Sequence, residues 1–453
     1  MFGIAIAVLV AVTFVLFTVF KNSSVDKLRQ ETNSNFKKIQ KRYLLIYCLA
    51  AFSDWLQGPY VYSLYKHFGY NEGQIAILFI TGTLSSSLFG TITGALADIY
   101  GRKSLCTWYG ILYTGCCVTK IFGNYQLLIL GRILGGLSTS ILFSAFESWY
   151  INEHINHYKL PNEWLNITFA TTTFCNATLA ILAGLISYVL VTVLEFGPVA
   201  PFIMAIPFLL TTSLLVRVFL HEHYKHNTKS ASASLKQAVV LWLGNKHIFT
   251  LSMVQSLYEG VMYLFIFFWT PALDSIKPPL GLVFSSFMLA LMIGSKLYSL
   301  IIEHRLLEPN GLLVLSTLLA TVSFLICALA MSNVFVHHAS NSVKVCYLLF
   351  LLFEISIGMY YPSMTYLKSQ VIPEKVRVTI SNVIKIPSNL FTCLALLWIR
   401  DNQQSIRTDF YIIFTVYLIC FIATFVTFVS SKIFSVLYRK TYLEFEKRDE
   451  LEI

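Results

Sequence analysis

Charged side chains are scarce in this sequence. Only 12% of its 453 residues are Asp, Glu, Lys or Arg, against roughly 25% in a typical soluble domain. With 56% apolar residues and a mean hydropathy of +0.67, the chain has more apolar surface than a soluble core would bury. The composition therefore excludes a disordered protein and a cytosolic enzyme of ordinary make-up, and we expect the lipid bilayer to cover much of the surface.

Motifs for catalysis and metal binding are also missing. The nine cysteines lie almost entirely in apolar runs without metal-ligand spacing. No phosphate-binding P-loop, H-E-x-x-H pair or nucleophile elbow occurs. We therefore expect no enzyme activity, no cofactor and no metal site. The excess of basic residues, 33 against 23 acidic, fits membrane orientation better than binding to nucleic acid.

Long apolar runs predict thirteen membrane-spanning helices. The first, Phe2 to Phe20, is followed rather than preceded by basic residues, so we interpret it as an uncleaved anchor with its N-terminus outside. A cleaved signal peptide is the alternative. Spans 1 to 12 are predicted at residues 43–65, 73–98, 104–122, 126–150, 165–194, 200–218, 249–270, 280–301, 311–331, 344–364, 377–399 and 409–431.

One long polar connection divides these twelve spans into six and six. Most Lys and Arg fall in the segments placed in the cytoplasm, as the positive-inside rule requires. The predicted parts of the chain are the anchor (1–20), a basic cytoplasmic linker (21–42), an N-terminal six-helix lobe (43–218), a cytoplasmic inter-lobe loop (219–248), a C-terminal six-helix lobe (249–431) and a cytoplasmic tail (432–453).

A short loop after span 2 carries a recognisable pattern. Gly94 allows close helix contact, Asp98 lies where the helix ends, and Gly101 permits a sharp turn before Arg102 and Lys103. This segment resembles the gating-loop signature of the major facilitator superfamily, in which the loop joins spans 2 and 3 on the cytoplasmic side. The resemblance implies a 6+6 helix bundle that moves solutes by alternating access. An ordinary basic loop is the alternative.

Away from the span ends, four acidic residues lie within predicted spans, one each in spans 1, 4, 7 and 10. Asp54, Glu259 and Glu354 lie near the middle of the membrane, and Glu147 lies nearer the cytoplasmic end of span 4. A carboxylate at that depth either ionises beside a cation or binds a proton, and both states suit a transporter. The alternative for each is a structural pair with Lys or Arg that locks the bundle.

Two basic residues are the expected cationic partners. Arg132 lies inside span 4, although it could instead extend to the membrane surface. Lys385 lies in span 11 beside Pro387, where we expect a kinked polar stretch. If RILGG of span 4 is aligned with EISIG of span 10, Glu354 takes the position of Arg132. Three amide side chains complete the candidate substrate site: Gln57, Asn382 and Asn389.

Longer segments resemble one branch of that superfamily, the molybdate-anion transporter family. The most specific are DWLQGPYVYSLY (Asp54 to Tyr65) and GRILGGLSTSILFSAFESWYINEH (Gly131 to His154), and the likeness runs from about residue 43 to about residue 400. The resemblance implies uptake of molybdate, a tetrahedral dianion, and it also accommodates the extra N-terminal helix. A dianion requires cations and N–H donors.

These inferences give a specific hypothesis. Arg132 and Lys385 hold the oxyanion, while one or more of Asp54, Glu259 and Glu354 binds a proton. We expect a monomer in the lipid bilayer, with the plasma membrane implied by the resemblance. The alternatives are a transporter of another small solute, either a sulfate-like anion or an organic metabolite, and a receptor or scaffold that does not transport.

Overall fold

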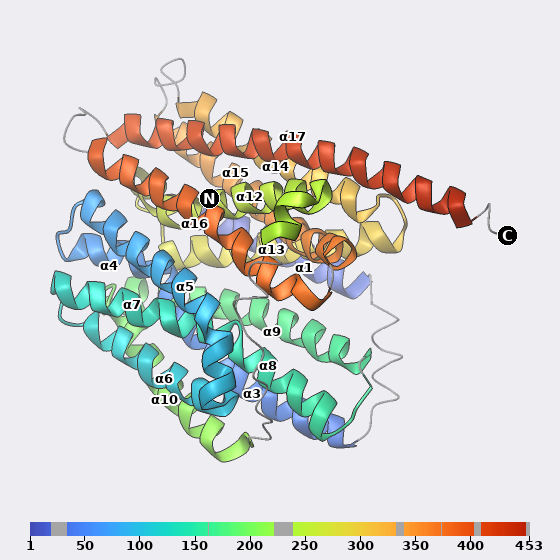
Figure 1. Ribbon diagram of the computed structural model, residues 1–453. Coiled ribbons are helices and arrows are strands. Elements are labelled where there is room, and N and C mark those ends of the chain that lie inside the picture. The colour runs from blue at the N-terminus through green and yellow to red at the C-terminus, as the bar shows by residue number, and fades with distance from the viewer. Residues whose placement is uncertain are drawn as a thin grey trace. The chain divides into compact units, whose positions relative to one another are not determined.

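The computed structural model describes residues 1–19, 34–161, 163–221, 239–331, 339–372, 374–402 and 409–449. In these ranges all regular structure is helical, without a strand (Figure 1). Ten of the described helices are long and apolar enough to cross a membrane, which confirms the predicted all-helical membrane protein. Much of the predicted basic linker and of the inter-lobe loop lies outside the described residues.

The chain divides into two compact units. Unit 1 comprises residues 1–229 and 278–289, and unit 2 comprises residues 230–277 and 290–453. The helices of unit 1 are α1 (Phe2–Val19), α3 (Ser34–Gln57), η1 (Gly58–Tyr60), α4 (Val61–His67), α5 (Glu72–Tyr100), α6 (Arg102–Thr119), α7 (Tyr125–Leu142), α8 (Ala145–Asn152), η2 (Glu153–His157), α9 (Glu163–Tyr188), η3 (Val189–Val193) and α10 (Ala200–Phe219).

Unit 2 contains the later helices, and α13 begins in unit 1 and continues into unit 2. These helices are α12 (Lys246–Leu273), η4 (Asp274–Ile276), α13 (Leu280–Glu303), α14 (Pro309–Met331), α15 (Ala339–Val371), α16 (Glu374–Asn402) and α17 (Asp409–Asp449). The last helix extends past residue 431, the predicted end of span 12. Helix α16 also runs through Pro387 without interruption.

Two predicted spans are each built from two consecutive helices. Span 1 changes from α3 to η1 and α4 at Gly58-Pro59, because proline has no N–H to continue the helical hydrogen bonds. Span 4 breaks between α7 and α8, where no proline occurs. There the Ser144 hydroxyl donates to the Ser140 carbonyl at 2.6 Å, a side-chain bond that competes with the helical backbone pattern.

The same helix pairings occur in both units. In unit 1, α6 packs against α7 and α10, and α3 packs against α9 and α10, with α6, α7 and α10 visible together in Figure 1. In unit 2, α14 packs against α15 and α17, and α12 packs against α16 and α17. Each pair of unit 2 corresponds to the pair six spans earlier. The two units therefore share one packing pattern, as an internal duplication requires.

The two units also share a close helix contact at a glycine. A Cβ on Gly136 of α7 would lie 2.7 Å from the Ser86 backbone nitrogen on α5, and a Cβ on Gly358 of α15 would lie 2.7 Å from the Ser295 backbone nitrogen on α13. Because both glycines allow this close helix contact, the RILGG and EISIG segments occupy matching places in the two units.

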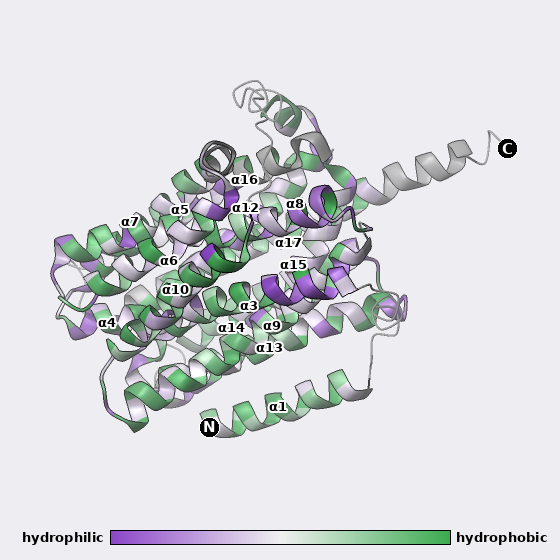
Figure 2. Ribbon diagram, turned by 90° about the horizontal axis from the view of Figure 1, so that it is seen from below, coloured by the Kyte–Doolittle hydropathy of each residue, from purple (hydrophilic) through white to green (hydrophobic). Residues whose placement is uncertain are grey.

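Helix α1 is apolar along its length, as the colouring of Figure 2 shows. Its Phe17 ring lies 5.7 Å from the Phe174 ring of α9, measured between centroids. The structure therefore has a hydrophobic helix at the position predicted for the N-terminal anchor.

Candidate functional site

The acidic residue of span 1 lies in a polar cluster of unit 1. Asp54, half-buried on α3, accepts a hydrogen bond from the Tyr113 hydroxyl of α6. One helical turn later, Gln57 is 2% exposed. Both side chains project to the same region because residues three apart share a helix face.

A buried lysine joins this cluster. Lys120, at the end of α6, is only 3% exposed, and its Nζ donates to Gln57 Oε1 at 2.8 Å. The ammonium group lies 4.5 Å from the centre of the Phe202 ring and interacts electrostatically with Asp54. The sequence interpretation missed Lys120, although a basic residue within predicted span 3 was a signal that could have identified it.

Arg132, predicted to hold the substrate, is fixed by backbone and ring contacts. Its Nε donates to the Leu78 carbonyl at 2.9 Å, and its guanidinium lies 4.9 Å from the centre of the Phe79 ring. The guanidinium passes so close to Gly82 that a Cβ there would collide with it. Within the described part of the chain, no acidic side chain pairs with Arg132. Lys120 therefore interacts with both Asp54 and Gln57, whereas the hydrogen-bond partner of Arg132 is a backbone carbonyl.

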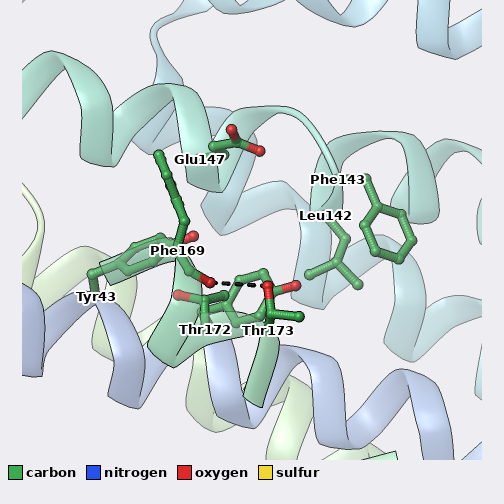
Figure 3. A pocket seen from close by; sticks show the side chains of 8 residues that line it. Tyr43, Leu142, Phe143, Glu147, Phe169, Thr172 and Thr173 are labelled. Carbon is green, nitrogen blue, oxygen red and sulfur yellow. Dashed lines mark hydrogen bonds between the residues drawn. The ribbon is translucent and has the colours of Figure 1, made fainter. Parts of the chain in front are cut away.

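Glu147 faces a cavity of about 310 Å³ in unit 1 (Figure 3). The lining side chains come from α3, from α9, and from the end of α7 and the start of α8. They are Tyr43, Tyr47, Leu142, Phe143, Glu147, Phe169, Thr172 and Thr173. In this lining, the Thr173 hydroxyl donates to the Phe169 carbonyl at 2.9 Å. The cavity offers hydroxyls and one carboxylate without a basic side chain in its lining, which makes it a poor place for a dianion.

The acidic residue of span 7 interacts electrostatically with two lysines of unit 2. Gln255 Nε2 donates to Glu259 Oε1 at 2.8 Å, one turn away on α12. Lys368 of α15 and Lys385 of α16 both act electrostatically on the Glu259 carboxylate. Lys385 was predicted as a cationic partner for the acids of the spans, whereas Lys368 was missed because it lies beyond the predicted end of span 10.

The remaining candidates of unit 2 lie on α15 and α16. Glu354 is 5% exposed on α15 and makes no hydrogen bond or ion pair to another described residue. Asn389 is buried on α16, one turn after Lys385. Asn382 belongs to the same helix, but its side chain lies outside the described residues.

The predicted gating loop contains a strained turn. Gly101, the residue before α6, has φ +84° and ψ 148°. This backbone conformation is essentially restricted to glycine. Arg102 Nη1 donates to the Ser148 carbonyl on α8 at 2.7 Å. The side chain of Asp98 and the environment of Gly94 lie outside the described residues, and Lys103 follows Arg102 in the first turn of α6.

Gly101→Ala is expected to lower the free energy of unfolding by about 1–3 kcal/mol, because a Cβ is strained at this φ and ψ. Thermal unfolding of the purified protein in detergent measures the loss. Gly3→Ala is the matched control, since nothing lies within 4 Å of the added methyl group. Equal melting temperatures for the two variants would contradict the assigned turn.

Comparison with known proteins places this chain among transporters. A family described as sugar transporters with 12 transmembrane helices matches residues 1–353. The molybdate-anion transporter of Takifugu rubripes is 38% identical over 392 residues, covering 81% of this chain and 80% of that protein. The transporter of the same name from Xenopus tropicalis is 36% identical over 378 residues, covering 83% and 82%.

Solved structures show the same fold at low sequence identity. A D-xylose-proton symporter superposes with a TM-score of 0.68 at 12% identity, covering 86% of this chain and 96% of that one. A bacterial homologue of the iron transporter ferroportin, in an inward-facing state, also gives 0.68, at 14% identity and with 88% and 98% coverage. From its helix pairings and its relatives across four-fifths of its length, the chain belongs to the molybdate-anion transporter family of the major facilitator superfamily.

Proposed function

We propose that this protein is a secondary active transporter that takes up molybdate by alternating access and uses protons as the coupling ion. The observation that carries the proposal is the 38% identity, over four-fifths of the chain, to relatives named molybdate-anion transporter. The substrate is a small molecule. The energy for its uptake comes from an ion gradient, because the sequence has no nucleotide-binding P-loop.

The charges in both units support an anionic substrate coupled to protons. In unit 1 Lys120 acts electrostatically on Asp54, and in unit 2 Lys368 and Lys385 act electrostatically on Glu259. Lysines provide the positive charge that a dianion needs in a pocket of low dielectric constant, and neighbouring carboxylates can bind protons. The roles first assigned to Arg132, Glu147 and Glu354 remain part of the proposal as secondary candidates.

The proposal includes a topology. Residues 43–218 and 249–431 act as the two six-helix lobes of a monomer, and helix α1 anchors the chain with its N-terminus outside. The C-terminus is cytoplasmic, because the basic segments are placed on the inner side. The plasma membrane is proposed from the resemblance to the molybdate-anion transporter family alone.

Uptake of labelled molybdate into liposomes containing the purified protein tests the function. Uptake should exceed that of protein-free liposomes, and it should increase when the outside is made more acidic than the inside. A protonophore should remove the increase but leave exchange of labelled for unlabelled molybdate intact. Tungstate should compete best among the added solutes, because it has the same charge and tetrahedral shape.

Sugar transport is the second candidate, favoured by the description of the matching family and by the hydroxyl-lined cavity of unit 1. Competition arms with sulfate, D-xylose and an organic cation separate these functions. Xylose uptake in the absence of any molybdate uptake would replace the first proposal with the second. Binding of molybdate without passage into liposomes would instead indicate a receptor.

A further inference from the structure

Three helices of unit 2 carry a carboxylate and the two ammonium groups that act on it electrostatically. Glu259 is on α12, Lys368 on α15 and Lys385 on α16. Two contacts fix the register between α12 and α16: the Ser256 hydroxyl donates to the Ile384 carbonyl at 3.1 Å, and the Thr392 hydroxyl donates to the Gly260 carbonyl at 3.2 Å. The turns that contain Glu259 and Lys385 therefore lie side by side.

Three buried polar atoms around this group have no hydrogen-bond partner among the described residues. They are Gln255 Oε1, the Tyr360 hydroxyl and the Ser388 hydroxyl, on side chains that are 3%, 0% and 1% exposed. A buried polar atom left without a partner costs about 1–3 kcal/mol, so such atoms usually meet a ligand or water. A concentration of three beside a charged cluster points to a binding site.

The residues that carry these three atoms lie on the same three helices as Glu259, Lys368 and Lys385. Gln255 is one turn before Glu259, and Ser388 is one turn after Lys385. The Tyr360 ring stacks on Tyr258, the neighbour of Glu259, at 4.1 Å between centroids. Each helix that supplies a charge therefore also supplies an unpaired polar atom.

The charge of the cluster is unbalanced. Two lysines and one carboxylate leave one net positive charge, and the side chain of Lys385 is exposed. If a dianion binds while Glu259 stays ionised, the net charge becomes negative by one. If Glu259 binds a proton at the same time, the cluster is neutral, which is the favoured state for buried charges.

We propose that Lys368 and Lys385 clamp a tetrahedral dianion, and that Glu259 is the counter-ion that the dianion displaces as the Glu259 carboxylate takes up a proton. This inference rests on the proposed function for the identity of the dianion. The hydroxyls of Tyr360 and Ser388 donate to the oxygens of the anion.

The proton has a defined place in this exchange. It comes from water on the entry side, forms an O–H bond on Glu259, and returns to water on the exit side when the carboxylate pairs again with the lysines. The Gln255 amide already donates to one Glu259 oxygen, and its own unpaired Oε1 can accept the new O–H. A carboxylic acid and a primary amide then satisfy each other.

No other charged group of the described residues competes for this role. The groups that face Glu259 are Lys368, Tyr360 and Tyr361 from α15, Lys385 from α16 and Tyr263 from α12 itself. The described part of α17, which also packs against α12, contributes no charge that acts on Glu259. Glu354 acts on Tyr258 and Tyr361 instead.

Equilibrium binding of labelled molybdate to the purified full-length protein tests the clamp. Lys368→Ala and Lys385→Ala should each raise Kd by about 10- to 100-fold, the loss expected for one charge-assisted hydrogen bond. Lys344→Ala is the matched control, because Lys344 is an exposed lysine on the same helix as Lys368. Its Kd should equal that of the unmodified protein.

Glu259→Gln tests the displaced counter-ion. Glutamine mimics the protonated acid, so molybdate binding should lose its dependence on pH and keep the affinity that the unmodified protein has in acid. In liposomes this variant should retain exchange but lose accumulation driven by a pH gradient. If Lys368→Ala fails to fold, the double variant Glu259→Gln/Lys368→Ala removes both charges of the pair and provides the same affinity test.

The outcomes separate the clamp from the function. If the unmodified protein takes up molybdate while both lysine variants bind it as Lys344→Ala does, the clamp is wrong and the proposed function stands. Retention of the normal pH dependence in Glu259→Gln would also overturn the inference. If the unmodified protein binds neither molybdate, tungstate nor sulfate, both the function and the clamp are rejected.

Discussion

Lys120→Ala is expected to lower the free energy of unfolding by about 1–3 kcal/mol, because the buried Gln57 amide oxygen loses its hydrogen-bond donor and Asp54 loses a neighbouring positive charge. Lys120 is 3% exposed, donates to Gln57 at 2.8 Å and interacts electrostatically with Asp54. Its loss therefore leaves a carboxylate and an amide oxygen without their cation. The melting temperature in detergent, followed by the amount of monodisperse protein, measures the effect.

A double-mutant cycle separates the charge from the packing of the lysine chain. Asp54→Asn should cost less in the Lys120→Ala background than in the unmodified protein, because the attraction between Asp54 and Lys120 is already absent there. Lys120→Met keeps an unbranched chain against Phe202, so it should recover the packing but not the charge. The control is Lys41→Ala, an exposed lysine of α3.

If Lys120→Ala melts as Lys41→Ala does, the cluster does not stabilise unit 1. Additive costs in the double variant would show that Asp54 and Lys120 do not interact. Because Tyr113 and Lys120 of α6 donate to Asp54 and Gln57 of α3, we expect this cluster to hold α3 against α6.

The sequence predicted the spans well wherever an apolar run ended at a polar or glycine boundary. Span 2 was predicted at 73–98 and α5 is Glu72–Tyr100, and span 6 was predicted at 200–218 and α10 is Ala200–Phe219. The break within span 4 was missed because serine hydroxyls, rather than proline or glycine, compete with the helix there. The extension of α17 was missed because charge content marks the end of an apolar span, not the end of a helix.

The candidate site was predicted less completely, for a geometric reason. Depth along a span follows from residue number, but the direction of a side chain around its helix depends on neighbours that are distant in sequence. Asp54 and Glu259 were therefore named as candidates from their depth, while Lys120 and Lys368 were missed near the ends of their helices. Arg132 was found, but its partner is the Leu78 carbonyl, which no pattern of charged residues could indicate.

Gly358→Leu is expected to destabilise unit 2 by about 3 kcal/mol, at the upper end of the usual cost of overpacking. A Cβ at this position would meet backbone rather than flexible side chains, with the Ser295 nitrogen at 2.7 Å and the Gly294 Cα at 2.9 Å. Helices α13 and α15 would have to separate, so the loss should appear as a lower melting temperature in detergent.

The size of the side chain gives this prediction an internal check. Gly358→Ala should lower the free energy of unfolding less than Gly358→Leu does, but more than Gly311→Leu does. A Cβ on Gly311 would meet only the flexible Leu307 side chain, at 3.7 Å. Since Gly136 has the matching place in unit 1, Gly136→Leu should reproduce the loss. Equal melting of Gly358→Leu and Gly311→Leu would refute the contact. A loss at only one of Gly136 and Gly358 would refute the equivalence of their segments, and with it the correspondence between Arg132 and Glu354.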